Sequence, residues 1–354
     1  MAQSDMNWAG FLKRFLLTLG LVLGLALGLV VLMNPFGNLS VRAFGTHVVM
    51  DTNDRFQLPA IVRSRAFDSV VIGTSSSKLL DPAWLEWAFG GSFANIAFND
   101  GRAWEEYQLA LLFLRTVPQP RTLLFGIDWV WCAADADVSR ITGRGFPPWI
   151  YDDASWNDWL YILNWRGVET AMRQLLNRAG LLPARVPANG FDMFVPREST
   201  YDASKARQHI WRGRAAPIVP HEPAYVATEA DRAHWQYPAL AWLDELAGNV
   251  PTGTRVILAF MPAHVAGQLQ PGSKDAAREA ECKARMAAIA TRRGAHLVDF
   301  KIVSPITTED ANYWDKLHYR LPIAQRIVEG IAKAVAAGKD DPGGDWRYLA
   351  GPAR

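Results

Sequence analysis

The feature that most constrains this chain is an uncharged apolar run near its amino terminus. Residues 15–33 read FLLTLGLVLGLALGLVVLM, in which Thr18 carries the only polar side chain. At ~1.5 Å rise per residue, a helix over this run is long enough to cross the ~30 Å hydrocarbon core of a bilayer. A soluble domain would have difficulty burying a helix that has no polar face. The run therefore predicts a transmembrane anchor over residues 15–33.

The residues that flank this run predict its orientation. Lys13 and Arg14 precede it directly, and the positive-inside bias then places residues 1–14 in the cytoplasm. We expect a single-pass protein of the cytoplasmic (inner) membrane, with its main domain in the periplasm or outside the cell. A cleaved signal peptide is the alternative, but its apolar region usually covers only ~7–15 residues and ends in a small-x-small site. Met33-Asn34-Pro35 offers no such site.

Charge and cysteine content argue against two classes of function. The net charge is +2 and no basic stripe stands out, which argues against nucleic-acid binding. Cys132 and Cys282 lie far apart and outside any CxxC pattern, which argues against a structural zinc site. The two cysteines could form one disulfide, but two buried free thiols are the favoured interpretation.

Tryptophan is abundant, with 15 residues in the chain. Most are expected to fill the core and its edges, as large aromatic side chains do. The abundance also fits one aromatic-lined groove, in which tryptophans lie under sugar rings, or contacts at the bilayer interface.

Beyond the anchor, strand and helix patterns alternate along the chain. Apolar β-rich runs are followed by stretches with apolar residues at helical spacing, which is typical of a parallel sheet with crossover helices. The predicted strands cover residues 67–72, 93–97, 121–130, 254–261 and 295–300, and the predicted helices cover residues 82–89, 103–117, 238–247, 274–293 and 322–337. The pattern predicts one doubly wound α/β domain.

The remaining segments complete the predicted domain organisation. Residues 34–66 are polar and mixed and are expected to form a stalk, and the α/β domain then covers residues 67–337. Residues 133–235 are rich in Trp, Pro and Arg and are interpreted as a large insertion or lid, with one helical pattern at 165–179. The polar tail at 338–354 is expected to be loosely ordered.

Two segments carry side chains suited to nucleophilic catalysis. Gly73-Thr74-Ser75 follows the first predicted strand, and loops at the carboxyl ends of parallel strands line the ligand crevice. A serine hydroxyl needs a base to become a good nucleophile. Asp315 and His318 lie three residues apart just before the last helix, where a carboxylate can orient an imidazole. Ser77 occupies the place of the last glycine in G-x-S-x-G, which argues against an α/β-hydrolase elbow.

Together these two segments resemble the SGNH/GDSL hydrolase superfamily. The resemblance is to its membrane-anchored branch, which includes accessory acyltransferases of surface-polysaccharide acylation. It implies a flavodoxin-like three-layer αβα domain. Gly73-Thr74-Ser75 matches the Gly-Asp-Ser block of the family, with Thr in place of Asp, which implies that Ser75 is the nucleophile. Asp315 and His318 match the family's DxxH block, which implies an orienting acid and a general base.

The same resemblance suggests where an oxyanion would bind. Asn99-Asp100-Gly101 resembles the second block of the family, in which the glycine donates a backbone N–H to the oxyanion. Asp128 stands where the family usually has Asn, and an ionised carboxylate would repel an oxyanion. Either Asp128 is protonated or turned away, or the oxyanion hole depends on backbone N–H groups at Gly73, Ser75 and Gly101, with Asn99 or Arg102 as a further donor.

These observations predict an extracytoplasmic serine-dependent O-acyltransferase or esterase that needs no cofactor or metal. The resemblance implies acetyl as the acyl group, a surface polysaccharide as the acceptor, and a multi-pass membrane partner that delivers acyl groups. The alternative is a catalytically weak subunit with a structural or binding role in a membrane complex.

Structural explanations also exist for the individual residues. Ser75 would cap a following helix, Gly101 would serve a turn, and Asp315 with His318 would form a surface turn. Glu105 and Glu106 are interpreted as capping or solvated residues at a helix start.

Overall fold

A six-stranded mixed sheet forms the centre of the molecule, with the strand order β2-β1-β3-β4-β5-β6. The computed structural model describes residues 7–39, 41, 49–51, 53–154, 156–212 and 218–352. The strands are β1 (Ser69–Gly73), β2 (Phe93–Asn95), β3 (Thr122–Ile127), β4 (Arg255–Phe260), β5 (His296–Asp299) and β6 (Arg347–Ala350). Neighbouring strands from β2 to β5 run parallel, and β6 runs antiparallel to β5. The predicted α/β class with a largely parallel sheet is confirmed.

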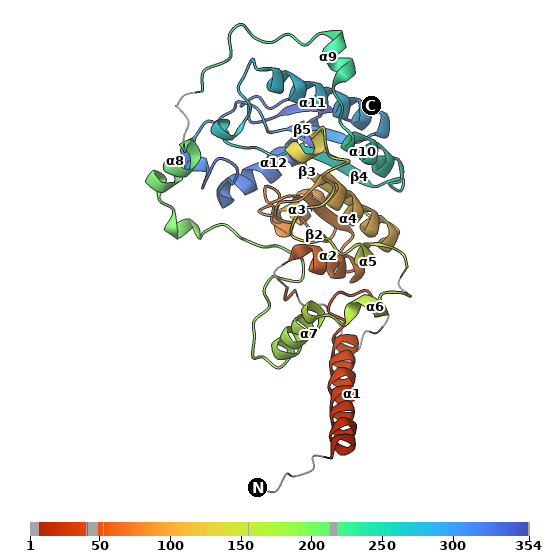
Figure 1. Cartoon of the computed structure of the whole chain (residues 1–354). Helices are drawn as coiled ribbons and strands as arrows, with labels where there is room; N and C mark the ends of the chain where they lie inside the picture. The colour runs from red at the N-terminus through yellow and green to blue at the C-terminus, as the bar shows by residue number, and fades with distance from the viewer. Residues whose placement is uncertain are drawn as a thin grey trace.

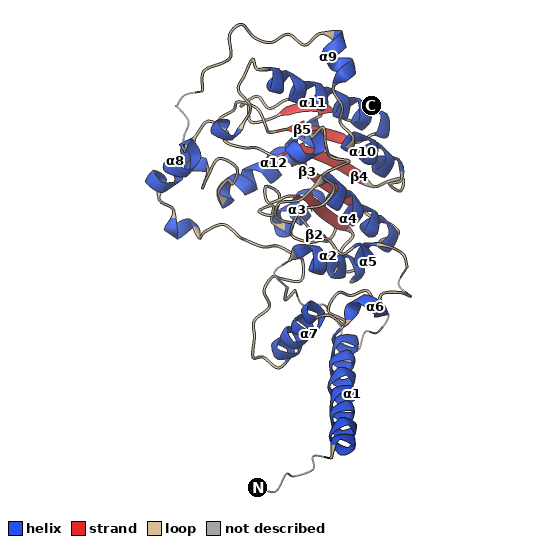
Figure 2. Cartoon of the chain, viewed as in Figure 1, coloured by secondary structure: helices blue, strands red, loops and turns tan. Residues whose placement is uncertain are grey.

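Helices cover both faces of this sheet (Figure 1, Figure 2). On one face, α4 (Ala103–Thr116), α10 (Ala239–Gly248) and α11 (Lys274–Arg293) pack against Val70, Ile72 and the residues that share their face. On the other face, α3 (Pro82–Phe89) and α12 (Leu321–Ala337) pack against Val71 and its neighbours. Successive residues of β1 point to opposite faces, and both faces are covered, so the whole strand is buried.

The ends of these helices follow local signals in the sequence. Asp81 caps α3 by accepting a hydrogen bond from the N–H of Ala83, and Ser273 caps α11 in the same way through Ala276. α11 ends at Gly294, which adopts a left-handed conformation that glycine tolerates best. All five predicted helices of the sheet domain therefore lie within one or two residues of their expected bounds.

The amino-terminal apolar run forms α1 (Trp8–Met33), a single helix that projects from the rest of the molecule (Figure 1). It starts before the predicted anchor because Asn7 caps it through the N–H of Gly10. It ends where Asn34 turns into the left-handed region and binds the carbonyl oxygens of Leu39 and Val41. By length and composition α1 is able to span a membrane.

Part of the predicted stalk belongs to the folded domain. Residues 54–63 form α2 (Asp54–Arg63), which packs against α4 and buries Leu58, Ile61 and Val62. The helix contains Pro59 and also buries polar side chains, so its sequence lacks an apolar stripe that would have revealed it. The interpretation of these residues as stalk is wrong, whereas residues 40, 42–48 and 52 lie outside the described part of the chain.

The expectation of a loosely ordered tail is also wrong. Trp346 is buried, and the strand that follows it, β6, pairs with β5 at the edge of the sheet. Arg326 of α12 binds both carboxylate oxygens of Asp345 at 2.6 Å. These contacts join the tail to distant elements, which its polar composition does not indicate.

The segment between β3 and α10 contributes helices, and its described residues contribute no strand to the sheet. Its helices are α5 (Pro148–Tyr151), α6 (Trp159–Ile162), α7 (Trp165–Arg178), α8 (Ala203–Trp211) and α9 (Glu229–His234). α5 packs on α2 and α4, whereas α7 packs on α1 and α8 on a short 3-10 helix, η4 (Asp310–Asn312). The segment therefore contacts α1 at one end and the loop before α12 at the other.

Cys132 and Cys282 form a disulfide, with a Cα–Cα distance of 5.8 Å. The interpretation of the two cysteines as free thiols is wrong. Cys132 lies in η1 (Trp129–Cys132), the 3-10 helix after β3, and Cys282 lies on the face of α11 that packs on the sheet. The fold brings them together across 150 residues of sequence, a separation that hides their pairing.

Candidate active site

Ser75 lies in a tight turn directly after β1. Ser77 N–H donates to the carbonyl of Thr74 at 3.0 Å, and Lys78 N–H donates to the carbonyl of Ser75 at 3.3 Å. The turn lies against Gly73 and Gly126, which are paired across β1 and β3. A Cβ atom at Gly126 would lie 1.7 Å from Ser77 Oγ, so only glycine allows this approach. No helix starts at Ser75, which excludes a helix-capping role for its side chain.

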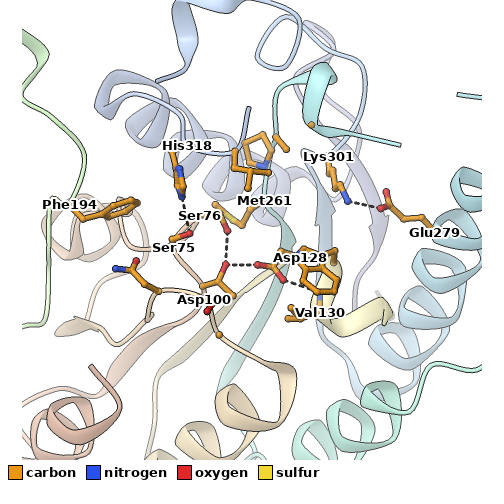
Figure 3. Close-up of a pocket in the computed structure, with 18 of the residues that line it drawn as sticks. Ser75, Ser76, Asp100, Asp128, Val130, Phe194, Met261, Glu279, Lys301 and His318 are labelled. Atoms are coloured by element: carbon orange, nitrogen blue, oxygen red, sulfur yellow. Dashed lines mark hydrogen bonds and ion pairs between the residues drawn. The ribbon is translucent and has the colours of Figure 1, made fainter. Parts of the chain in front are cut away.

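Ser75, His318 and Asp315 form a continuous hydrogen-bonded chain. Ser75 Oγ lies 3.0 Å from His318 Nε2, and His318 Nδ1 lies 2.8 Å from Asp315 Oδ2. Figure 3 shows Ser75 and His318 joined across the site, with Phe194 beside them. The edge-to-face contact of Phe194 with the imidazole, at 5.2 Å between ring centroids, further restricts the orientation of His318.

Asp315 is held in place by its own loop. Its Oδ1 accepts hydrogen bonds from the N–H groups of Leu317 at 2.7 Å and His318 at 2.9 Å. Burial tends to raise the pKa of Asp315, but the hydrogen bonds from His318 and from these N–H groups outweigh it, so the pKa lies below its usual value. The carboxylate therefore stays ionised and able to orient the imidazole. The geometry contradicts a simple surface turn at Asp315 and His318.

Ser75 and His318 line a cavity of about 730 Å³, and Asp315 lies behind His318. Its lining comes from loops at the carboxyl ends of β1, β2, β3, β4 and β5 and from the 133–235 segment. The lining residues include Ser75, Asn99, Gly101, Asp128, Trp129, Arg144, Phe194, Met261, Lys301 and His318. Lys301 pairs with Glu279 at 2.5 Å on the side of the cavity away from the serine (Figure 3).

The structure separates the predicted oxyanion residues into two groups. Gly101 and Asn99 line the cavity with Ser75. Among the described residues, the backbone N–H groups of Ser75 and Gly101 and the side-chain NH₂ of Asn99 have no hydrogen-bond acceptor, so they are free to donate to a developing oxyanion. The backbone N–H of Asn99 instead donates to Asp54 Oδ2 at 3.4 Å. A Cβ at Gly101 would lie 2.8 Å from the Phe98 ring, which explains the need for glycine.

Gly73 and Arg102 do not reach this cavity. Gly73 lies beneath the turn, where a Cβ would meet Ser77 Oγ at 2.5 Å. The Arg102 guanidinium lies over the Trp129 ring, 5.5 Å from its centroid. Gly73 therefore supports the turn, and Arg102 packs against a cavity wall.

A buried ion pair holds the loop that carries Asn99 and Gly101. Arg55 of α2 binds both carboxylate oxygens of Glu105 at 2.7 Å and is 1% exposed. The same guanidinium donates to the carbonyls of Asn99 at 3.2 Å and Asp100 at 2.8 Å. Glu105 also accepts from the N–H of Arg102, so it does cap α4. Glu105 is not solvated, however, because it is buried against Arg55 of α2. The sequence does not predict this helix.

Glu106 is buried on the other side of α4, so its interpretation as a capping or solvated residue is wrong. Its Oε2 accepts a hydrogen bond from Trp131 Nε1 at 2.9 Å. Burial, reinforced by the negative charge of Asp128, raises the pKa of Glu106 well above its usual value. Glu106 therefore holds its proton to a higher pH than an exposed glutamate does.

Asp128 faces the cavity and binds the turn that carries Ser75. Its Oδ2 accepts a short hydrogen bond from Thr74 Oγ1, and its Oδ1 accepts from Val130 N–H at 3.1 Å. Burial raises the pKa of Asp128, and these two hydrogen bonds partly oppose the shift. The hydrogen bond between Thr74 and Asp128 therefore joins the turn after β1 to the end of β3.

Lys78 ties the nucleophile turn to two remote segments. It is 2% exposed and binds Asp54 of α2 at 3.0 Å and Asp192 of the 133–235 segment at 2.9 Å. Asp192 lies two residues before Phe194, so this contact also positions the ring that packs on His318. Neither Lys78 nor Phe194 stands in a recognisable motif, and only their contacts indicate a role.

His264 is fully buried between Trp211 and Tyr313 and lies 3.0 Å from Asp310, away from the cavity, so it has a structural role. Among the described residues, no group of three His, Cys, Asp or Glu side chains could hold a metal ion.

The sequence matches no protein-family model, and no curated protein is significantly similar to it.

Proposed function

We propose that this chain is a membrane-anchored serine-dependent acyl-transfer enzyme of the SGNH/GDSL type, either an O-acyltransferase or an esterase. The observation that carries the proposal is the chain of hydrogen bonds from Ser75 to His318 and Asp315, with distances of 3.0 Å and 2.8 Å, at the wall of a large cavity. A serine, a histidine base and an orienting aspartate thus lie in the order, and at the hydrogen-bonding distances, that nucleophilic catalysis requires.

The sheet topology supports the same family. The parallel strands follow the order β2-β1-β3-β4-β5, which is the order of flavodoxin-like doubly wound domains. In such sheets ligands bind at the carboxyl ends of the strands, where the strand order reverses. Here the reversal lies between β1 and β3, and Ser75 follows β1. The antiparallel β6 extends this arrangement at the far edge.

The proposed reaction begins when Ser75 Oγ attacks the carbonyl carbon of an ester. His318 Nε2 accepts the hydroxyl proton, and Asp315 stabilises the imidazolium that forms. The N–H groups of Ser75 and Gly101, with the Asn99 amide, stabilise the oxyanion. His318 then donates its proton to the departing alcohol, which leaves an acyl-Ser75 ester. A sugar hydroxyl or water, deprotonated by His318, attacks this ester and restores the serine.

The cavity supports a carbohydrate acceptor. Trp129 and Phe194 contribute aromatic surface to its wall, and polar side chains such as Asn99 and Arg144 also line it. Aromatic faces beside hydrogen-bonding groups suit sugar rings, which combine apolar C–H faces with hydroxyl edges. We propose acetyl as the acyl group and a cell-surface polysaccharide as the acceptor.

The proposed location is the outer side of the cytoplasmic membrane. α1 is able to span the bilayer, and Lys13 and Arg14 favour a cytoplasmic amino terminus. The disulfide between Cys132 and Cys282 supports an oxidising compartment for the rest of the chain. An enzyme in this position would receive acyl groups from a multi-pass membrane partner, because activated acyl donors are made in the cytoplasm.

The second candidate function is a binding subunit with little catalytic activity. The observation that favours it is Asp128, a carboxylate on the cavity wall where an oxyanion site needs hydrogen-bond donors. The 3.0 Å contact between Ser75 and His318 favours the enzyme, because a binding subunit has no need of a serine on a general base.

The deciding experiment is labelling of the purified full chain with a fluorophosphonate probe. We expect labelling of the wild type, loss in Ser75→Ala and strong reduction in His318→Ala. Ser76→Ala is the matched control, because its hydroxyl faces Thr74 Oγ1 at 3.3 Å and has no contact with His318. Its labelling is expected to persist. An unlabelled but folded wild type, also inactive on a short acetyl ester, would favour the binding subunit.

A further inference from the structure

An exposed apolar surface lies beside the end of α1 that enters the domain. It is formed by Trp156, Trp159, Leu160, Trp165, Met172 and Leu175, which we call the aromatic collar. Trp156 is 78% exposed, Leu160 77% and Trp165 80%. All six lie within α6, α7 and the residues next to them. Such a concentration of exposed large apolar side chains marks an interaction surface.

Within the collar, α7 is amphipathic, but its polar face is buried and its apolar face is exposed. The residues that it buries against the protein are Gly167, Thr170, Ala171 and Gln174, which are small or polar. Trp165, Met172 and Leu175 instead point away from the protein. A surface helix of a soluble domain normally turns its apolar stripe inward. The reversal indicates that a second apolar medium covers the outer face.

The position of α7 identifies that medium. Val30 and Met33, in the last turns of α1, form a small buried cluster with Ile162 and Ala171. Figure 1 shows α6 and α7 beside this end of α1. If residues 15–33 cross the hydrocarbon core, Val30 and Met33 lie at its outer boundary, and the collar lies at the same level. Tryptophan is enriched at this boundary, and amphipathic helices lie in its plane.

We propose that the aromatic collar inserts into the interfacial region of the outer leaflet and fixes the catalytic domain against the membrane. The proposal rests on α1 spanning the bilayer, which is part of the proposed function, and it is independent of the chemistry at Ser75. The chain would then have two attachments to the bilayer, and the second would restrict the tilt of the domain about α1.

The charges near the collar indicate that apolar burial drives this contact. Arg166 pairs with Asp51 at 2.6 Å, and Arg173 pairs with Glu169 at 3.0 Å. Because these cations already have carboxylate partners, anionic lipid adds little attraction. We therefore expect docking on zwitterionic phosphatidylcholine vesicles and expect it to survive high salt.

The test places nitroxide labels on introduced cysteines in the full chain, reconstituted into phosphatidylcholine vesicles. Both native cysteines are in the disulfide, so each new cysteine is labelled selectively. Leu160→Cys and Met172→Cys report on the collar. Val226→Cys, 81% exposed in the loop before α9, is the aqueous control, and Leu23→Cys is the control within α1. Collisions with oxygen report lipid exposure, and collisions with a water-soluble nickel complex report water exposure.

Labels at 160 and 172 are expected to show an oxygen-to-nickel collision ratio severalfold above that at 226 and below that at 23. Water exposure at 160 and 172, with position 23 still in lipid, would overturn the collar alone. Water exposure at position 23 would overturn the anchor in the proposed function as well. Shielding of 160 and 172 from both reagents would show a protein contact, such as a second copy of this chain. Release of the collar by high salt would contradict apolar docking.

Discussion

At the scale of single residues, Asp128 has two roles that conflict. It holds Thr74, and through it the turn of Ser75, but it also brings a carboxylate to the wall where an oxyanion would form. Burial raises the pKa of Asp128, so this carboxylate becomes neutral at a higher pH than an exposed aspartate does. The rate of acyl transfer should therefore depend on the fraction of molecules in which the Asp128 side chain is neutral.

We expect Asp128→Asn to increase the rate of hydrolysis of a short acetyl ester. An amide removes the negative charge and still accepts the Thr74 hydrogen bond, and a single oxyanion donor is worth about 10²–10³ in kcat. An increase of about tenfold would fit partial use of the new donor. The ratio of the Asp128→Asn rate to the wild-type rate should increase with pH, because Asp128 of the wild type ionises as pH rises. Equal rates for Asp128→Asn and wild type across the pH range would show that Asp128 faces away from the reaction.

Glu106 predicts a pH-dependent effect on stability. The folded chain keeps its proton to higher pH than the unfolded chain, because burial raises the pKa of Glu106. Stability therefore falls as pH rises above the unfolded pKa, by up to about 1.4 kcal/mol per pH unit, until the folded carboxyl also ionises.

Glu106→Gln keeps the oxygen that accepts from Trp131 and removes this proton. We expect the variant to gain stability over the wild type as pH increases from mildly acidic to mildly basic. Chemical unfolding at several pH values measures the difference. A difference that does not change with pH would mean that Glu106 has an ordinary pKa.

At the scale of elements, α2 connects the membrane-proximal part of the chain with the site. Arg55 joins it to Glu105 and to the carbonyls before Gly101, and Asp54 joins it to Lys78 after Ser75. One helix thus fixes both the nucleophile turn and the loop with the proposed oxyanion donors. These side chains are positioning residues, because they act through the backbone they hold.

Arg55→Met should lower the free energy of unfolding by about 3–5 kcal/mol, because it leaves Glu105 buried without its partner. Arg55→Met combined with Glu105→Gln should recover part of this loss, since no buried charge remains. Acyl transfer by the double variant should stay below the wild type, because the carbonyls of Asn99 and Asp100 have lost their donor. Full activity in a stable double variant would show that Arg55 acts on folding alone.

The disulfide joins η1 to α11 and closes a long loop that includes α5 to α10. Cys132→Ser with Cys282→Ser should lower the free energy of unfolding by about 2–4 kcal/mol. Denaturant unfolding of the full chain in detergent measures the loss. Reductant should shift the wild-type midpoint toward that of the variant and leave the variant unchanged. Identical midpoints without reductant would show that the bond contributes nothing to stability.

At the scale of the whole molecule, the site and the membrane-directed helix are coupled through the 133–235 segment. This segment packs on α1 through α7, supplies Phe194 to the site, and reaches the loop before α12 through α8. Trp211 of α8 donates to Asp310 at 2.9 Å, five residues before Asp315. The segment therefore extends along the molecule from α1 to the loop that carries Asp315 and His318.

The orientation of the chain in a membrane can be tested with reporter fusions in a bacterial host. Alkaline phosphatase fused to the carboxyl terminus should be active, because it folds in an oxidising compartment. A β-galactosidase fusion at the same position is the matched control and should be inactive. Replacing Lys13 and Arg14 with Gln should reduce the phosphatase activity, since these residues bias orientation. An active β-galactosidase fusion would place the domain in the cytoplasm and contradict the proposed location.

By itself, the amino-acid sequence determined what depends on local pattern. The apolar run of α1, the alternation of strands and helices, and the position of Ser75 at the end of the first strand are all visible over a few residues. Asp315 and His318 share one short loop, so their pairing was also a local inference. Fold class and the nomination of a candidate site could therefore be predicted before the structure.

Only the tertiary structure decided what depends on residues far apart in the chain. The pairing of Cys132 with Cys282, the buried contact of Arg55 with Glu105, and the approach of Phe194 to His318 join segments separated by dozens of residues or more. The pairing of β6 with β5 and the exposure of the apolar face of α7 likewise depend on the elements that pack beside them. Burial is the physical reason: it selects partners by position in space, and neither composition nor periodicity contains that position.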